Sequence, residues 1–134
     1  MRRELTADSS MPNRMGMRLR HLGLPVRDFE RSLRFYTTYF GFDPATAQTY
    51  PDGTTIVRNA ERFDLALHPT PDAVAAEGFL HFGFFMADAA AVHTLRKRLE
   101  QDGVPIIETD NEPNLVSFKC LDPDGWHIEA YWEP

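Results

Sequence analysis

The chain has little cysteine and no long apolar run. Its 134 residues include one cysteine, Cys120, so no disulfide can form within the chain. A lone cysteine agrees with a reducing compartment, and we expect a cytoplasmic protein. No segment approaches the roughly 20 apolar residues that a membrane-spanning helix needs, so we expect no membrane role.

Positive charge is also scarce. The chain has 14 Lys and Arg against 20 Asp and Glu, which gives a net charge of −6. Binding to nucleic-acid phosphates needs a concentrated basic face, so we expect no nucleic-acid partner. Residues 1–17 show neither a helical nor a strand period and lack the apolar segment of a signal peptide. We expect a flexible tail over 1–17 and a single domain over 18–134.

What the chain does contain is an internal repeat. HLGLPVRD at 21–28 and HFGFFMAD at 81–88 have His, Gly and Asp at the same spacing. Each copy is typical of a strand that leads into a helix capped by the Asp. Alternate side chains of a strand share a face, so each His lies with the following Gly on the less apolar face. Because glycine leaves room there, this face could form a cavity.

The order strand, helix and three strands occurs twice, which predicts two tandem βαβββ modules of the α+β class. Module one covers 18–68, module two covers 79–132, and a linker over 69–78 with two prolines joins them. We predict one helix between Asp28 and Gly41 and a second between Asp88 and Gly103. The predicted strands are 18–26, 42–50, 54–59 and 62–68, then 79–86, 105–109, 114–121 and 126–132.

With a His on the first strand of each module and Glu129 after the DPDG turn at 122–125, the chain resembles the vicinal oxygen chelate superfamily, also called the glyoxalase/bleomycin resistance protein/dioxygenase family. The resemblance covers about residues 18–132. It implies a curved cup of mixed sheet with the helices on its outer face. It also implies that His21, His81 and Glu129 bind one divalent metal ion. The fourth ligand position of glyoxalase I falls on Ala66, which cannot ligate.

The chemistry of these three residues supports a metal site independently. Two imidazoles and one carboxylate suit Fe(II) or Mn(II), which we favour over Zn or Ni, and leave positions open for water and substrate. Each residue alone is more often structural, but the repeated His together with Glu129 favours one metal ion per site. The alternative is a sheet that kept the pattern and lost the metal.

Strand parity places further residues on the cavity face. Lys119 lies ten residues before Glu129, where related dioxygenases and fosfomycin-resistance transferases carry a tyrosine, and its ammonium could bind an anionic substrate or reach solvent. Lys119 and His68 are the catalytic candidates. Cys120 has the opposite parity and is expected to be an inert packed thiol. The candidates for substrate contact are Gly23, Asp64, Ala66, Gly83, Phe85, Ser117, Lys119 and Tyr131.

Two classes of function follow. The first is a metal-dependent enzyme acting on a small oxygen-chelating substrate, either dioxygenase-like or lyase- or transferase-like. Ala66 disfavours glyoxalase I, and Arg62-Phe63-Asp64-Leu65-Ala66 replaces the His-His-x-Leu-Ala run of extradiol enzymes. The second class is a metal-free drug-binding protein of the bleomycin-binding kind, which the intact set of ligands disfavours.

The short linker also predicts the assembly. Ten residues span at most ~33–36 Å, and two prolines hinder folding back, so the modules of two chains can exchange partners. We therefore expect a twofold homodimer with two equivalent sites. Each site would take His21 from one chain and His81 with Glu129 from the other.

Overall fold

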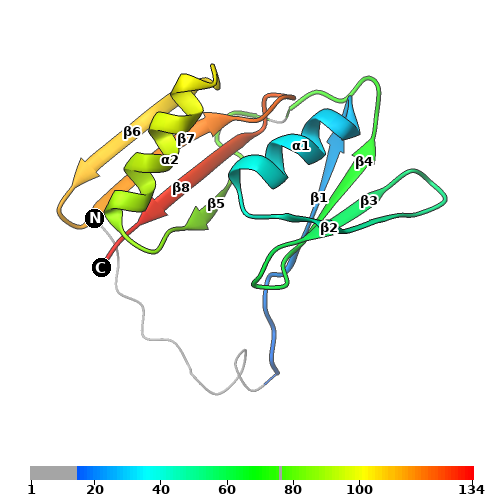
Figure 1. The fold of residues 1–134 in the computed structure, drawn as a ribbon, viewed down its shortest axis with the longest axis horizontal. Helices are drawn as coiled ribbons and strands as arrows, with labels where there is room; N and C mark the ends of the chain where they lie inside the picture. The colour runs from blue at the N-terminus through cyan, green and yellow to red at the C-terminus, as the bar shows by residue number, and fades with distance from the viewer. Residues whose placement is uncertain (1–14, 76) are drawn as a thin grey trace.

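The chain folds as two successive modules of the same design (Figure 1). The computed structural model describes residues 15–75 and 77–134, so residues 1–14 of the tail expected at 1–17 lie outside the described residues. Module one consists of β1 (His21–Val26), α1 (Phe29–Tyr39), β2 (Asp43–Thr49), β3 (Thr55–Arg58) and β4 (Asp64–Pro69). Module two consists of β5 (His81–Phe85), α2 (Ala89–Gln101), β6 (Ile106–Glu112), β7 (Leu115–Leu121) and β8 (His127–Trp132).

The strands of each module form one four-stranded mixed sheet. The order is β1-β4-β3-β2 in the first sheet and β5-β8-β7-β6 in the second. In both, the first strand runs parallel to the last, and the other pairs are antiparallel. The predicted α+β fold with two tandem βαβββ modules is confirmed. Two strand limits differ by three residues from the prediction. β1 begins at His21, and β6 continues to Glu112 because it pairs with β7 as far as Leu115.

Both helices begin and end where the sequence predicts. The side chain of Asp28 accepts a hydrogen bond from Arg31 N, and that of Asp88 accepts one from Ala91 N, so each aspartate caps its helix. Gly41 and Gly103 follow the helices with φ of 76° and 81°, values that glycine adopts without strain. In the described part of the chain, no helix is both long and apolar enough to cross a bilayer.

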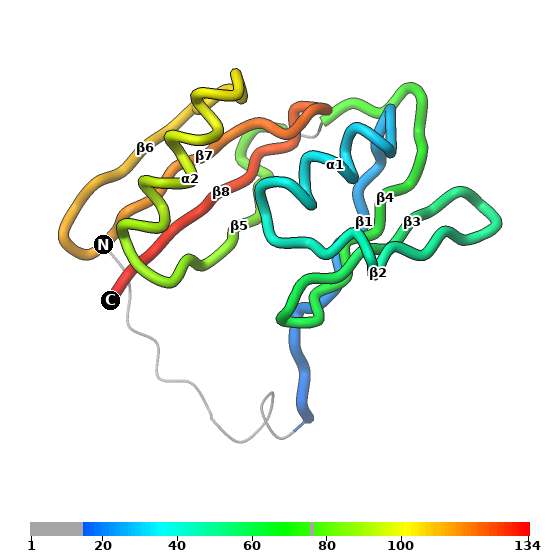
Figure 2. The backbone as a smooth tube through the Cα atoms, viewed as in Figure 1, coloured from blue at the N-terminus to red at the C-terminus, as the bar shows by residue number. Residues whose placement is uncertain are grey.

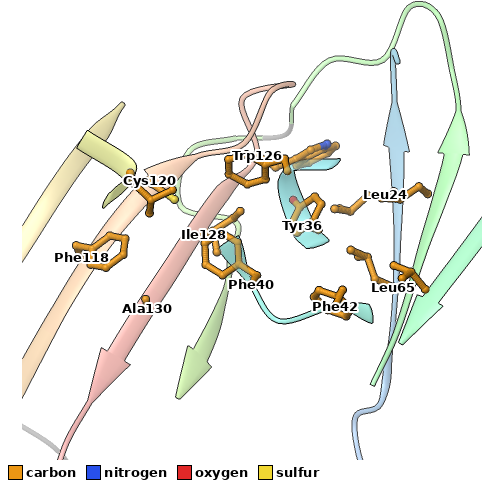
Figure 3. Packing of buried hydrophobic residues seen from close by; sticks show 14 of the residues in the cluster. Leu24, Tyr36, Phe40, Phe42, Leu65, Phe118, Cys120, Trp126, Ile128 and Ala130 are labelled. Atoms are coloured by element: carbon orange, nitrogen blue, oxygen red, sulfur yellow. The ribbon is translucent and has the colours of Figure 1, made fainter. Parts of the chain in front are cut away.

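Helix α1 lies between the two sheets and packs against both (Figure 2). The rings of Tyr36 and Phe82 lie 6.5 Å apart, and those of Phe40 and Phe84 stack at 4.9 Å. Figure 3 shows Tyr36 of α1 between Leu24 and Leu65 of module one and apolar side chains of β7 and β8. A single apolar cluster therefore joins the modules. Cys120 belongs to it, and burial raises the pKa of its thiol to about 12, as expected for an inert packed thiol.

Polar contacts also join the modules at the turn between β7 and β8. Tyr36 Oη donates to Asp122 Oδ2 over 2.7 Å, and Trp126 Nε1 donates to Pro25 O over 3.1 Å. Asp124, whose side chain is 1% exposed, accepts hydrogen bonds from Arg27, Arg31 and Ser32. The two aspartates of the DPDG turn thus bind α1 and the residues that precede it.

Candidate functional site

One face of each sheet packs against the helices, and the opposite face is the one on which the predicted site residues lie. On β8, Ile128 and Ala130 are buried in the core, whereas Glu129 and Tyr131 alternate with them and are partly exposed. On β5, Gly83 is exposed between partly buried Phe82 and Phe84. Each module therefore presents an open sheet face with its own hollow.

The module-two hollow has a volume of about 390 Å³ and is lined by His81, Gly83, Leu115, Glu129, Tyr131 and Glu133. The Nδ1 atom of His81 lies 2.6 Å from Phe79 O. A carbonyl oxygen only accepts hydrogen bonds, so Nδ1 is the donor in this contact and Nε2 is the ring nitrogen left to bind a metal ion. This is the arrangement that orients a histidine as a metal ligand. Glu129 adds a carboxylate to the same hollow.

The other candidates of module two surround this hollow. Lys119 pairs with Glu129 across β7 and β8, but its Nζ atom lies 3.1 Å from Glu108 Oε2 and 6.0 Å from the Phe79 ring. Lys119 is thus held beside the hollow, with its charge partly neutralised. The Phe85 ring packs against Tyr131 at 5.5 Å. Ser117 is buried, with its hydroxyl 3.4 Å from Asp110 Oδ2.

The module-one hollow has a volume of about 530 Å³ and is lined by Arg18, Arg20, His21, Arg58, Arg62 and Asp64. In the sheet, His21 pairs with Asp64, and Asp64 pairs with Arg58. Arg58 Nε lies 2.6 Å from Asp64 Oδ1, so this carboxylate is already engaged. The module-one hollow is therefore strongly basic, whereas two glutamates make the module-two hollow acidic.

The remaining candidates of module one lie on β1 and β4. Gly23 pairs with Ala66, and a Cβ added at Gly23 would meet nothing within 4 Å. His68, the second catalytic candidate, is exposed farther along β4. Its Nδ1 atom lies 2.7 Å from Thr54 Oγ1 and 3.8 Å from Asp52 Oδ2. His68 lines neither of these two hollows.

The three predicted metal ligands are divided between the two hollows of one chain. His81 and Glu129 line the module-two hollow, and His21 lines the module-one hollow. Over residues 15–75 and 77–134, no three His, Cys, Asp or Glu side chains lie close enough to hold one metal ion. The donor types fit an Fe(II) or Mn(II) site, and one chain supplies two of the donors together.

Sequence reasoning missed the arginines of the module-one hollow and Glu133 of the module-two hollow. Arg18 and Arg20 stand next to His21 in the sequence, which is a usable signal. Arg58 and Arg62 come close to His21 only through the pairing of β3 with β4 and of β4 with β1, which no local pattern reveals.

Comparison with known proteins agrees with this architecture. Residues 18–130 match the family model of the Glyoxalase/Bleomycin resistance protein/Dioxygenase superfamily. An uncharacterized protein of Pseudomonas aeruginosa is 32% identical over 130 residues, which cover 90% of this chain and 92% of that protein.

Two further relatives have more informative names. Catechol-2,3-dioxygenase of Bacillus subtilis is 29% identical over 83% of this chain, which spans 41% of that enzyme. The structure of a possible glyoxalase from Bacillus cereus superposes with a TM-score of 0.72 at 25% identity, over 85% of this chain and 97% of the other.

Proposed function

The chain belongs to the Glyoxalase/Bleomycin resistance protein/Dioxygenase superfamily, and from this premise we propose that it is a divalent-metal-dependent enzyme. Its substrate is a small molecule with neighbouring oxygen atoms that can chelate the metal. His21, His81 and Glu129 would hold Fe(II) or Mn(II), which supplies Lewis-acid or redox chemistry at open coordination positions. A dioxygenase-like reaction and a lyase- or transferase-like reaction both fit this set of ligands.

The observation that supports the proposal most is the hydrogen bond that His81 makes. Its Nδ1 donates to Phe79 O at 2.6 Å, which orients the ring and leaves Nε2 as the nitrogen that can bind a metal ion beside Glu129. Gly83 lines the same hollow and, because it has no side chain, leaves more room in it.

The proposed site is completed by a second copy of the chain. His21 lines a hollow of its own, so a twofold dimer that places the module-one hollow against the partner's module-two hollow would unite the three ligands twice. Opposite charges on the two hollows favour this pairing. Large apolar side chains beside both hollows are also exposed, as expected for an interface: Leu19 at 87%, Phe79 at 75%, Leu80 at 59% and Phe85 at 61%.

Metal analysis tests the proposal directly. Protein purified without oxygen and supplied with Fe(II) or Mn(II) should retain about one ion per chain, because three donors are needed to hold such an ion against water. His81→Ala and Glu129→Ala should lose the ion. His93→Ala, on helix α2, should retain it and serves as the control. Absence of both bound metal and a thermal shift in the wild type would refute the enzyme proposal.

Mixed dimers test where the ligands come from. A His21→Ala chain paired with a Glu129→Ala chain should recover one intact site of two, although each parent homodimer has none. The control pairs wild type with a chain carrying both substitutions, and it should bind no metal. If each chain instead builds its own site, the first mixture binds none and the second binds one ion per dimer.

The second candidate is a metal-free protein that binds small molecules, in the manner of bleomycin-binding proteins. It is favoured by the exposed aromatic side chain of Phe85, which packs on Tyr131 at the edge of the module-two hollow. Such a protein would bind an aromatic ligand equally well before and after His81→Ala. The proposed enzyme would not.

A further inference from the structure

Four arginines line the module-one hollow, and two of them are engaged with other described residues. Arg58 is bound to Asp64, and Arg20 Nη2 donates to Arg62 O over 2.9 Å. Within the part of the chain that the structure describes, the guanidinium groups of Arg18 and Arg62 have no hydrogen-bond or ion-pair partner. A guanidinium offers paired N–H donors whose geometry matches the oxygens of a carboxylate or phosphate group.

Arg62 also has an unusual backbone conformation. Its φ is 61°, and it is the one non-glycine residue with positive φ among the described residues. This left-handed region places the Cβ of an L-residue too close to the carbonyl oxygen, so glycine and, less often, asparagine occupy it. An arginine at such a position is disfavoured by its own backbone.

The turn between β7 and β8 in module two has a glycine at the position equivalent to Arg62. Gly125 has φ of 90°, and its N donates to Asp122 O over 3.0 Å, just as Arg62 N donates to Asn59 O over 3.0 Å. The next residue in each turn donates to the side chain of the first, with Trp126 N to Asp122 Oδ1 at 2.8 Å and Phe63 N to Asn59 Oδ1 at 2.9 Å. The two turns are equivalent, and module one has Arg where module two has Gly.

The geometry of the turn does not explain an arginine at this position. The strained backbone of Arg62 therefore needs a different explanation. Strained residues that the surrounding structure holds in place concentrate at functional sites. Arg20 holds the Arg62 carbonyl, and the Arg62 side chain lines the same hollow as His21. A positive charge thus lies beside a candidate metal ligand at a position where the backbone conformation disfavours arginine.

We propose that Arg62, assisted by Arg18, binds an anionic group of the substrate, so the substrate carries a carboxylate or a phosphate-type oxyanion in addition to its chelating oxygens. The proposal rests on the proposed function for the site at which those oxygens bind. The excess positive charge supports it. The lining of the module-one hollow has four arginines and one carboxylate, that of Asp64.

The test uses ligands that differ only in the anionic group. Catechol is neutral, 3,4-dihydroxybenzoate adds a carboxylate, and 3,4-dihydroxyphenylphosphonate adds a phosphonate. Calorimetry on the full chain, with and without Mn(II), should show binding of at least one anion about tenfold tighter than that of catechol. The tighter of the two anions identifies the class of oxyanion.

The variants separate a functional from a structural role for Arg62. Arg62→Gly and Arg62→Asn should remove the preference for the anion, while both resist urea as well as or better than wild type because the strain is relieved. Arg34→Ala, which removes a positive charge from the exposed side of α1, should keep the preference. A structural role predicts instead that Arg62→Gly lowers the urea midpoint and leaves the preference unchanged.

The outcomes also distinguish this inference from the proposed function. An anion preference that persists without any metal binding would refute the metal proposal and leave the anion site standing. Metal binding with equal affinity for catechol and both anions would overturn the anion site alone. If Arg62→Gly dissociates the dimer in sedimentation and leaves ligand preference unchanged, the arginine serves the interface, and the inference is wrong.

Discussion

The turn between β3 and β4 and the turn between β7 and β8 have the same backbone and opposite uses. Residues 122–125 point two carboxylates inward, where Tyr36 and the residues around the start of α1 bind them. Residues 59–62 make the same backbone hydrogen bonds, yet their arginine lines the open hollow. The turn geometry is therefore set by the repeat, whereas the side chains decide whether a turn packs into the core or lines the candidate site.

The helices differ in the same way. Helix α1 contacts both sheets: its Tyr36 ring lies near Phe82 of β5, and Phe40, directly after the helix, stacks on Phe84. Helix α2 packs on β6, β7 and β8 of its own sheet. Module one thus supplies the helix that joins the modules, and module two supplies the buried acidic turn that receives it. Substitutions in the acidic turn should therefore affect stability more than those in its counterpart.

The largest expected effect comes from Asp124→Ala. The change leaves Ser32 Oγ and Arg27 N without their acceptor at a buried position, which should lower the free energy of unfolding by about 3 kcal/mol. Urea denaturation measures the loss. Asp72→Ala, which removes an exposed carboxylate from the linker, is the matched control and should change little. Equal loss in both variants would mean that the acidic turn does not join the modules.

Exchanging the residues at the left-handed positions should give effects of opposite sign. Gly125→Arg imposes on module two the strain that Arg62 carries, and it should cost about 1–2 kcal/mol. Arg62→Gly removes that strain from module one, so it should not lower stability. Thermal unfolding of both variants under the same conditions checks the pair. Two changes of the same sign would show that the turns are not equivalent.

Asp122→Asn gives module two the kind of residue that Asn59 provides in module one, and its effect should depend on pH. Burial raises the pKa of Asp122 above its ordinary 3.8, although Tyr36 and two backbone amides oppose the rise. The folded state then binds the proton more tightly than the unfolded state. This contribution to stability is complete below pH 3.8 and is lost as pH rises through the raised pKa.

The asparagine variant lacks that titration. Apart from a loss of about 1 kcal/mol for the altered Tyr36 hydrogen bond, its stability relative to wild type should improve as pH rises from below 3.8 toward neutral. Urea unfolding of both proteins across this range measures the difference. A constant difference over the whole range would mean that Asp122 titrates alike in the folded and unfolded states.

The smallest expected effect is the difference in stability between substitutions at the two glycines of the repeat, Gly23 and Gly83. A Cβ at Gly83 would lie 3.2 Å from the Tyr131 ring, whereas one at Gly23 would meet nothing within 4 Å. Gly23→Ala should stabilise by about 0.5 kcal/mol through the unfolded chain. Gly83→Ala should gain less or nothing, because Tyr131 has to move. Melting temperatures of the two variants test the order, and a larger gain at Gly83 would contradict the contact with Tyr131.

The sequence predicted the local structure well because local structure depends on short spacings. Asp28 and Asp88 cap the helices, and Gly41 and Gly103 follow them, as their positions indicated. Strand β6 was predicted too short because its outer half, an edge segment rich in charge, lacks the alternation that marks a half-buried strand.

By itself, then, the sequence determined the repeat, the order of its elements and the residue types available to the candidate site, since each follows from patterns within short segments. Only the tertiary structure decided that α1 lies between the sheets, that Arg58 and Arg62 gather around His21, and that His21 is separated from His81 and Glu129. These features depend on strand register and on packing between modules. Both bring together residues distant in the chain, and no local pattern encodes the partner of such a contact.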